Sequence, residues 1–313
     1  MNYKKIGLIL GAGTVLGTSS AFANLVITPT FDSTITSNGS SAQIQATINQ
    51  AIAFYNANFT DNITVAIKFQ LGGGLGSNSS YYQFKTYASV RTALGADATS
   101  ADDTTAMSFL ATGAVNPVTA GANMALTNAN ARALGYTVAF GNGGSDPFDS
   151  TVTLNTSICN LVHGTNTNSG FYDLYAVVSH EIDEALGTSS LAGDPFGSGR
   201  TNVADMYRYN NGARTWDTNN GHAAFFSING TTNIVEYNAL GQTGGDWGDW
   251  IHHNGAPQVQ DFSGTPGVTV DMGPSELRLL DVVGYNRAAA VPEPNVILGL
   301  GLGAVALIRR RKK

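Results

Sequence analysis

Residues 171–187 constrain the fold of this chain most, because their pattern requires a long helix that buries one face. The apolar residues of the segment share that face: Phe171, Leu174, Tyr175, Val178, Ile182, Ala185 and Leu186. Gly187 follows directly, and glycine is the residue that most often ends a helix. The sequence therefore predicts a helix over this segment, packed against a hydrophobic core.

The same segment carries side chains that bind metal ions. His180 and Glu184 are four residues apart, so they project from one face of the helix and can reach one ion. Glu181 lies one step around the helix, where it would act as a general base beside metal-bound water. The chain has five His and five Glu in 313 residues, so an H-E-x-x-E spacing is expected by chance on the order of once in a thousand such chains.

The acids of this segment lie at the unfavourable end of the helix. Glu181, Asp183 and Glu184 fall near its C-terminus, where the macrodipole disfavours each anion by roughly 0.3–1 kcal/mol. No Lys or Arg follows before Arg200, so a bound cation would compensate the acids. A solvated acidic helix end is the alternative interpretation.

The remaining residues between 24 and 290 predict a mixed fold. Apolar residues open a strand at 25–27, recur at helical spacing over 40–59 and alternate over 62–71. The other expected elements are a helical or mixed aromatic segment at 81–94, strands at 133–140 and 150–155, and a last helix from Pro274 to before Gly284. We therefore expect one α+β domain with a twisted sheet, two long helices and an irregular C-terminal half.

The two ends of the chain predict export. Residues 1–23 combine Lys4 and Lys5, an apolar run and an A-x-A cleavage site, which is the pattern of a signal peptide. Residues 291–313 contain Pro-Glu-Pro, thirteen apolar or glycine residues and a basic tail. A bilayer core needs about 20 apolar residues, so the stretch is marginal as a span. A simple C-terminal anchor is the alternative interpretation of this tail.

Charge and cysteine content narrow the function classes. Without 1–23 and 291–313 the domain keeps 9 Lys and Arg against 21 Asp and Glu, a net charge of −12. Such an acidic surface repels phosphate backbones, so nucleic acid is not an expected partner. Cys159 is the one cysteine, which excludes an internal disulfide and leaves a core or metal ions to stabilise the domain.

The helix resembles the active-site helix of metzincin and matrixin-type zinc peptidases, in which His-Glu-x-x-x-Ala-Leu-Gly precedes a sharp turn. Gly187 matches the turn glycine. Two positions depart from that pattern: Glu184 replaces the second histidine, and Ser190 stands where the third ligand is expected. The tail resembles the PEP-CTERM sorting signal of Gram-negative bacteria, which implies removal by a membrane protease of the exosortase type.

The mature chain also resembles exported, often PEP-CTERM-tagged bacterial proteins that are classed as metalloproteases and carry H-E-I-x-E at this position. The resemblance extends to four further blocks: residues 205–209, 225–230, 245–250 and 280–285. It implies a zincin-like fold, Zn²⁺ at the site, a peptide or protein substrate, and a location at the cell envelope surface or outside the cell. Contact with the membrane would be transient and made through the tail.

The third metal ligand is open at the level of sequence. Asp205 is the first choice, because it heads the block at 205–209 and a carboxylate binds zinc well. Asp194 and His222 are further candidates, and pairing with Arg208 is the structural alternative for Asp205. One imidazole and two carboxylates form a harder site than three histidines, so a modest rate or a metal other than zinc is a further hypothesis.

Other residues have weaker claims. Met272 precedes the last helix, roughly where metzincins place a methionine turn, although a core position explains it as well. Asp246 and Asp249 flank two tryptophans and would bind Ca²⁺ or a glycan, or cap a loop. The structural interpretation is favoured there. Tyr207 or Tyr209 would stabilise an oxyanion, with packing as the default, and the pair His252 and His253 is expected on the surface.

The sequence thus predicts a secreted or surface-sorted metal-dependent endopeptidase, with Glu181 as the catalytic base and His180, Glu184 and Asp205 as metal ligands. Two alternatives remain. An inactive relative would bind matrix polysaccharide or a surface protein, and a structural surface protein would be stabilised by Ca²⁺.

Overall fold

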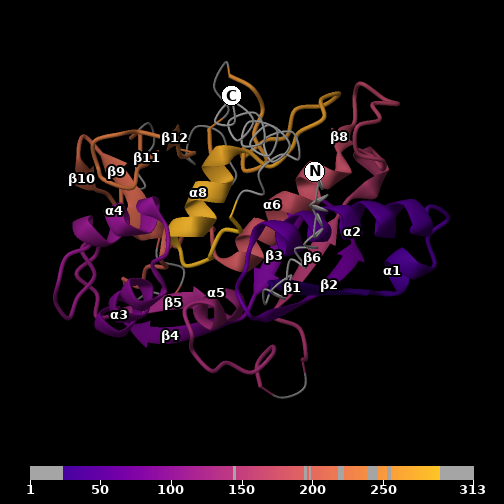
Figure 1. The fold of residues 1–313 in the computed structure, drawn as a ribbon. Coiled ribbons are helices and arrows are strands. Elements are labelled where there is room, and N and C mark those ends of the chain that lie inside the picture. The colour runs from indigo at the N-terminus through magenta and orange to yellow at the C-terminus, as the bar shows by residue number, and fades with distance from the viewer. Residues whose placement is uncertain are drawn as a thin grey trace, which may run out of the picture.

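The computed structural model describes residues 24–143, 146–193, 196, 199–217, 222–238, 246–251 and 255–289. These residues form a mixed α+β structure, which confirms the expected fold class at that level (Figure 1). One cluster of buried apolar side chains spans the described chain, from Leu25 just before its first strand to Tyr285 after the last helix. The predicted signal peptide (1–23) and sorting signal (291–313) lie outside the described residues.

A four-stranded sheet is the base of the structure, with the strand order β1-β2-β6-β3. Its strands are β1 (Val26–Phe31), β2 (Thr64–Leu71), β6 (Ser150–Leu154) and β3 (Gly76–Ser80). The first three run parallel, whereas β3 pairs antiparallel with β6. β3 is therefore an edge strand, and no described strand pairs with its outer side.

Two long helices lie along one side of this sheet (Figure 1). They are α2 (Ser41–Asn58) and α6 (Leu174–Leu186), and both confirm the sequence prediction. The buried positions of α2 follow the helical spacing: Ile44, Thr47, Ile48, Ala51, Ile52 and Tyr55. α6 packs on α2, β3 and β6, so its polar residues are held beside the edge strand.

A second group of short elements extends the N-terminal half. Its members are β4 (Tyr82–Thr86), α3 (Tyr87–Asp97), α4 (Ala101–Phe109), β5 (Asn123–Thr127) and α5 (Asn128–Ala133). The short helix α1 (Ser33–Thr36) lies apart from them, against β2 and α2. β4 and β5 form an antiparallel pair. The strand expected over 133–140 is wrong, because the Thr127 side chain caps α5 and Gly135, with a φ of 79°, follows the helix end. Residues 136–143 contain no strand.

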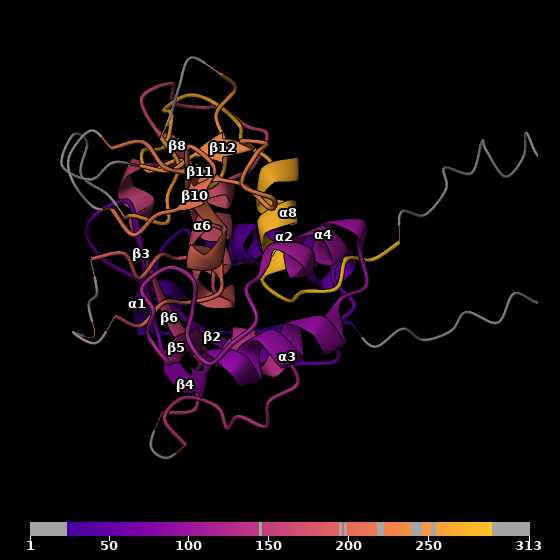
Figure 2. The same cartoon turned by 90° about the vertical axis from the view of Figure 1, so that its left-hand side faces the viewer.

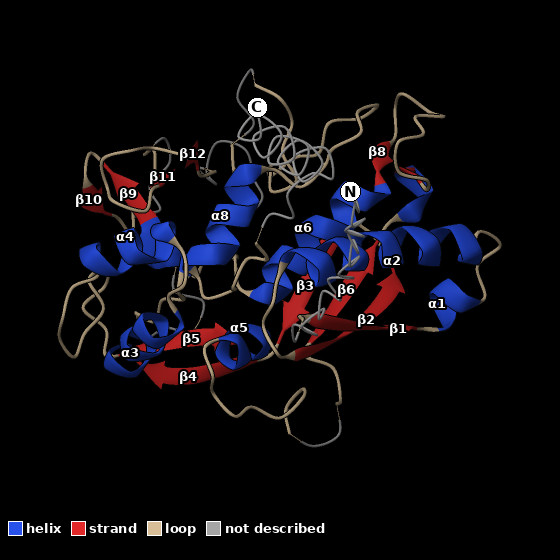
Figure 3. Ribbon diagram, viewed as in Figure 1, coloured by secondary structure: helices blue, strands red, loops and turns tan. Residues whose placement is uncertain are grey.

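The C-terminal half consists mostly of loops, as expected (Figure 3). Its short strands are β7 (Cys159–Asn160), β8 (Tyr172–Asp173), β9 (Arg208–Asn210), β10 (Ala213–Arg214), β11 (Phe225–Phe226) and β12 (Val235–Glu236). The last four form a sheet in the order β10-β9-β11-β12. The final helix is α8 (Pro274–Val282), where the proline suits the first turn.

Helix α6 lies between the four-stranded sheet and the C-terminal segments, as two perpendicular views show (Figures 1 and 2). Glu181 of α6 accordingly lies against Gly76 of β3, and His180 contacts Val259 in the loops that precede α8. Within the described part of the chain, none of the helices has the length and apolar character needed to cross a membrane.

Candidate metal centre

Helix α6 is fixed at both ends by its own sequence. The carboxylate of Asp173 caps its start by accepting a hydrogen bond from the Tyr175 N–H at 3.1 Å. Gly187 ends it in the left-handed region, with a φ of 112°, and donates its N–H to the carbonyls of Asp183 and Glu184. The helix thus presents His180, one turn before Glu184, in a defined orientation.

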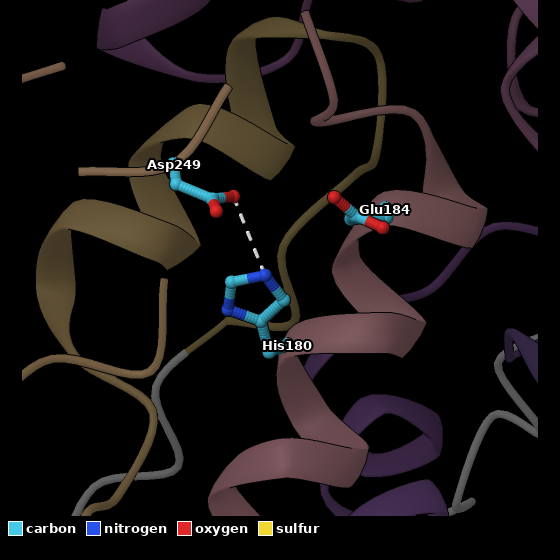
Figure 4. A group of neighbouring side chains, drawn as sticks. All are labelled: His180, Glu184 and Asp249. Atoms are coloured by element: carbon cyan, nitrogen blue, oxygen red, sulfur yellow. Dashed lines mark ion pairs between the residues drawn. The ribbon is translucent and has the colours of Figure 1, made fainter. Parts of the chain in front are cut away.

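Three ligand-type side chains converge above this helix. His180 and Glu184 come from α6, and Asp249 comes from the loop between β12 and α8 (Figure 4). Each offers one ligand atom, and these atoms lie within 4.8 Å of one another. His180 Nε2 is 3.3 Å from Asp249 Oδ1, and both carboxylates are buried. The arrangement could hold one metal ion.

The orientation of the His180 ring is set by a backbone carbonyl. Its Nδ1 lies 2.9 Å from the carbonyl oxygen of Val259. Because a carbonyl oxygen can only accept, Nδ1 carries the proton and donates it. In the neutral ring this leaves the lone pair on Nε2, directed toward Asp249, which is the usual arrangement for a metal-binding histidine.

Glu181 shares a cavity of about 240 Å³ with His180, Glu184 and Asp249. The strand β3 approaches it so closely that a Cβ at position 76 would overlap its Oε1. Its other oxygen, Oε2, is buried and accepts no hydrogen bond from any described residue. Burial raises the pKa of Glu181 to about 7, with His180 opposing the rise and Asp249 adding to it. A carboxyl group that gains and loses its proton near neutral pH suits a general base.

The cavity has an excess of negative groups. Asp173, Asp246 and Asp261 also line it, so six carboxyl groups surround one imidazole. Burial raises the pKa of Glu184 well above its usual value, with His180 opposing and Glu181 and Asp249 adding to it. For His180 burial lowers the pKa, but the nearby carboxylates outweigh burial and raise it well above its usual value. A divalent cation would neutralise this excess of negative charge, so that the carboxyl groups could stay ionised.

Asp205, the third ligand expected from sequence, is not brought together with His180 and Glu184, and the third carboxylate of the group is Asp249. The Asp205 carboxylate accepts hydrogen bonds from Ser190 Oγ at 2.5 Å, Leu191 N at 3.1 Å and Asn202 N at 3.0 Å. These donors tie the carboxylate to residues 190, 191 and 202, so it stabilises the loop after α6.

The other sequence candidates are scattered. His222 is exposed and pairs with Asp217, and Asp194, His252 and His253 lie outside the described residues. Tyr207 and Tyr209 are buried without lining the cavity, which agrees with packing. Met272 is buried, with its Sδ 3.5 Å from the hydroxyl of Tyr55. The Tyr55 hydroxyl in turn donates a hydrogen bond to Asp183 Oδ1 of α6 at 2.7 Å.

Comparison with known proteins adds no relative to this picture. No protein-family model, curated protein or solved structure matches the chain.

Proposed function

We propose that the chain is a metal-dependent endopeptidase with a zincin-like domain, exported to the cell envelope surface or beyond. The proposal rests on one observation: His180, Glu184 and Asp249 line the same cavity as the buried carboxyl group of Glu181. The Oε2 atom of Glu181 has no hydrogen-bond partner among the described residues. The three ligand groups would hold the ion, and Glu181 would handle protons.

A divalent ion held there would polarise the scissile carbonyl and make a coordinated water more acidic. Glu181 takes a proton from the attacking water and returns it to the leaving amine. Its carboxyl lies in the same cavity as the three ligand groups, which places it beside the water that a metal ion there would bind. The hydrogen bond from His180 to Val259 keeps the ring in the required tautomer throughout.

The outer edge of strand β3 favours a peptide as the substrate. Gly76, Ser77 and Asn78 line the cavity, and no described strand pairs with the outer side of β3. An extended peptide can add there as a further strand, with backbone hydrogen bonds that do not depend on its sequence. Apolar residues form the adjoining wall, which would receive a substrate side chain: Leu75, Ala176, Val177, Phe262, Val268 and Val270.

The proposal is tested by hydrolysis of casein with protein purified without chelator. A chelator should abolish turnover, and Zn²⁺, Mn²⁺ or Co²⁺ should restore it. Glu181→Gln should retain the metal and lower turnover by on the order of 10³-fold, because only the proton carrier is lost. Glu236→Gln on β12, outside the cavity, is the matched control and should leave turnover unchanged.

Three results would contradict the proposal. Equal turnover by Glu181→Gln and wild type would remove the assigned base. Retention on matrix polysaccharide without chelator-sensitive hydrolysis would favour a binding protein, and a large rise in melting temperature with Ca²⁺ alone would favour a structural calcium site.

A further inference from the structure

Gln260 stands beside the proposed ligands and has an unexplained buried oxygen. Its side chain is 1% exposed, and its Nε2 lies 3.4 Å from His180 Nε2 and 3.5 Å from Asp249 Oδ1. Its Oε1 is buried and has no hydrogen-bond partner among the described residues. A buried acceptor without a hydrogen bond lowers stability by about 1–3 kcal/mol. The burial of Oε1 at this position therefore needs a physical explanation.

The distances around Gln260 match a coordination sphere. Gln260 Nε2, His180 Nε2 and Asp249 Oδ1 form a triangle with sides of 3.3, 3.4 and 3.5 Å. Two ligands that each lie about 2.0–2.1 Å from a tetrahedral ion are about 3.4 Å apart. The triangle therefore has the dimensions of one face of a coordination tetrahedron. The Glu184 oxygen, within 4.8 Å of its His180 and Asp249 partners, is available as a further protein ligand. An ion that takes more than four ligands, as Mn²⁺ does, would keep a position for the water of the proposed function.

The amide can turn its oxygen into this triangle. The two ends of a glutamine amide have nearly the same shape, so a half-turn about its last side-chain bond exchanges nitrogen and oxygen. In this structure the Nε2 end of the amide lies beside Asp249 Oδ1 and His180 Nε2. With a cation between them, the carbonyl oxygen is the favoured end, because it has lone pairs to donate.

The backbone at Gln260 is held in place from two sides. The buried Glu276 of α8 accepts hydrogen bonds through Oε1 from Val259 N at 2.9 Å and Gln260 N at 3.4 Å. The Gln260 carbonyl accepts from Trp250 N at 2.8 Å, directly after Asp249. Hydrogen bonds thus join the backbone of residues 259 and 260 both to α8 and to Trp250, the neighbour of Asp249.

We propose that Gln260 is the fourth ligand of the metal centre, binding through Oε1 beside His180, Glu184 and Asp249. The donor set then contains one imidazole nitrogen and three oxygens, with two negative charges that balance a divalent ion. Mn²⁺ prefers oxygen ligands, so this donor set suits Mn²⁺ more than three histidines would. The inference rests on the proposed function, since it assumes an ion at this site.

Co²⁺ is the probe for this test, because its visible absorption reports the number and type of ligands. The full chain is titrated with Co²⁺, following the absorption band and the heat of binding. Wild type should bind one Co²⁺. Gln260→Met, which has similar volume but a soft thioether, should bind at least tenfold more weakly with an altered band. Gln260→Glu should bind at least as tightly as wild type, and Gln70→Met on β2, whose amide contacts Thr153, should behave as wild type.

The outcomes separate the two proposals. No Co²⁺ binding by wild type would overturn the metal centre, and with it the role of Gln260. Co²⁺ binding by Gln260→Met with the wild-type affinity and band would overturn only the assignment of Gln260. If Gln260→Met does not fold, as circular dichroism would show, Gln260→Glu decides: weaker binding than wild type overturns the assignment.

Discussion

The two halves of this molecule are built by different means. The N-terminal half and α6 are organised by apolar periodicity, with β2 alternating and α2 burying one face. After Gly187 the strands are two or three residues long, and buried polar groups hold the loops. Asp205 and Glu276 each accept several backbone N–H groups there.

This difference matters for the site because each half contributes part of it. The helix α6 supplies His180, Glu181 and Glu184 on a rigid support, whereas loops supply Asp249 and Gln260. Regular structure thus positions the proposed base and two of the proposed ligands. The loop contribution depends on hydrogen bonds to buried carboxylates, and a bound ion would join the two halves.

The largest effect is expected from the rigid half, at the contact between β3 and α6. In Gly76→Ala the new Cβ would overlap Glu181 Oε1 and crowd Val177, so the base would be displaced. Misplacement of a catalytic group by about 1 Å can cost about 100-fold, and we expect turnover of casein to fall by that order. Gly73→Ala, which meets nothing within 4 Å, should be neutral. Similar rates for both variants would contradict the close approach.

A smaller effect is expected from the loop half, at Glu276. In Glu276→Gln an amide replaces a carboxylate that accepts hydrogen bonds from the N–H groups of Val259, Gln260 and Gly273. The loss should lower the free energy of unfolding by about 1–3 kcal/mol, measured with urea, and weaken metal binding. Loss of stability without any change in metal affinity would show that the loops do not position the site.

The smallest effect is expected where the segment before β2 contacts the segment after α8. Burial raises the pKa of Asp61 to about 7, although the backbone N–H of Asn286 donates to it and opposes the rise. The unfolded chain then loses its proton at lower pH than the folded one, so stability should fall as pH rises from about 4 to about 7. Asp61→Asn cannot ionise and should show a shallower decline in urea midpoints over that range. Identical slopes would contradict the raised pKa.

The sequence predicted the regular elements well where periodicity was present. The helices α2, α6 and α8 and the strands β1, β2 and β6 lie where the pattern placed them. β3 was not predicted, because Gly-Ser-Asn-Ser-Ser has no apolar alternation and its pairing with β6 depends on backbone hydrogen bonds. α4 was also missed, although Ser100 and Asp103 form a capping box at its start.

The site was predictable only as far as the helix extends. The spacing of His180, Glu181 and Glu184 follows from helical geometry, so one turn of sequence was sufficient. Asp249 is brought to them by loop packing, which no local pattern encodes, and it was assigned to a turn or calcium role instead. Asp205 was preferred because it heads the block at 205–209 and a carboxylate binds zinc well, but its carboxylate accepts hydrogen bonds from neighbouring N–H groups. Gln260 gave no signal, since a lone glutamine matches no metal motif.

The most direct test is the metal content of protein purified without chelator, compared between two aspartate variants. The account predicts about one transition-metal ion per chain in wild type, retention in Asp205→Asn, and near-complete loss in Asp249→Asn, because only Asp249 faces His180 Nε2. Metal-free wild type, or equal metal content in wild type and Asp249→Asn, would contradict the proposed centre.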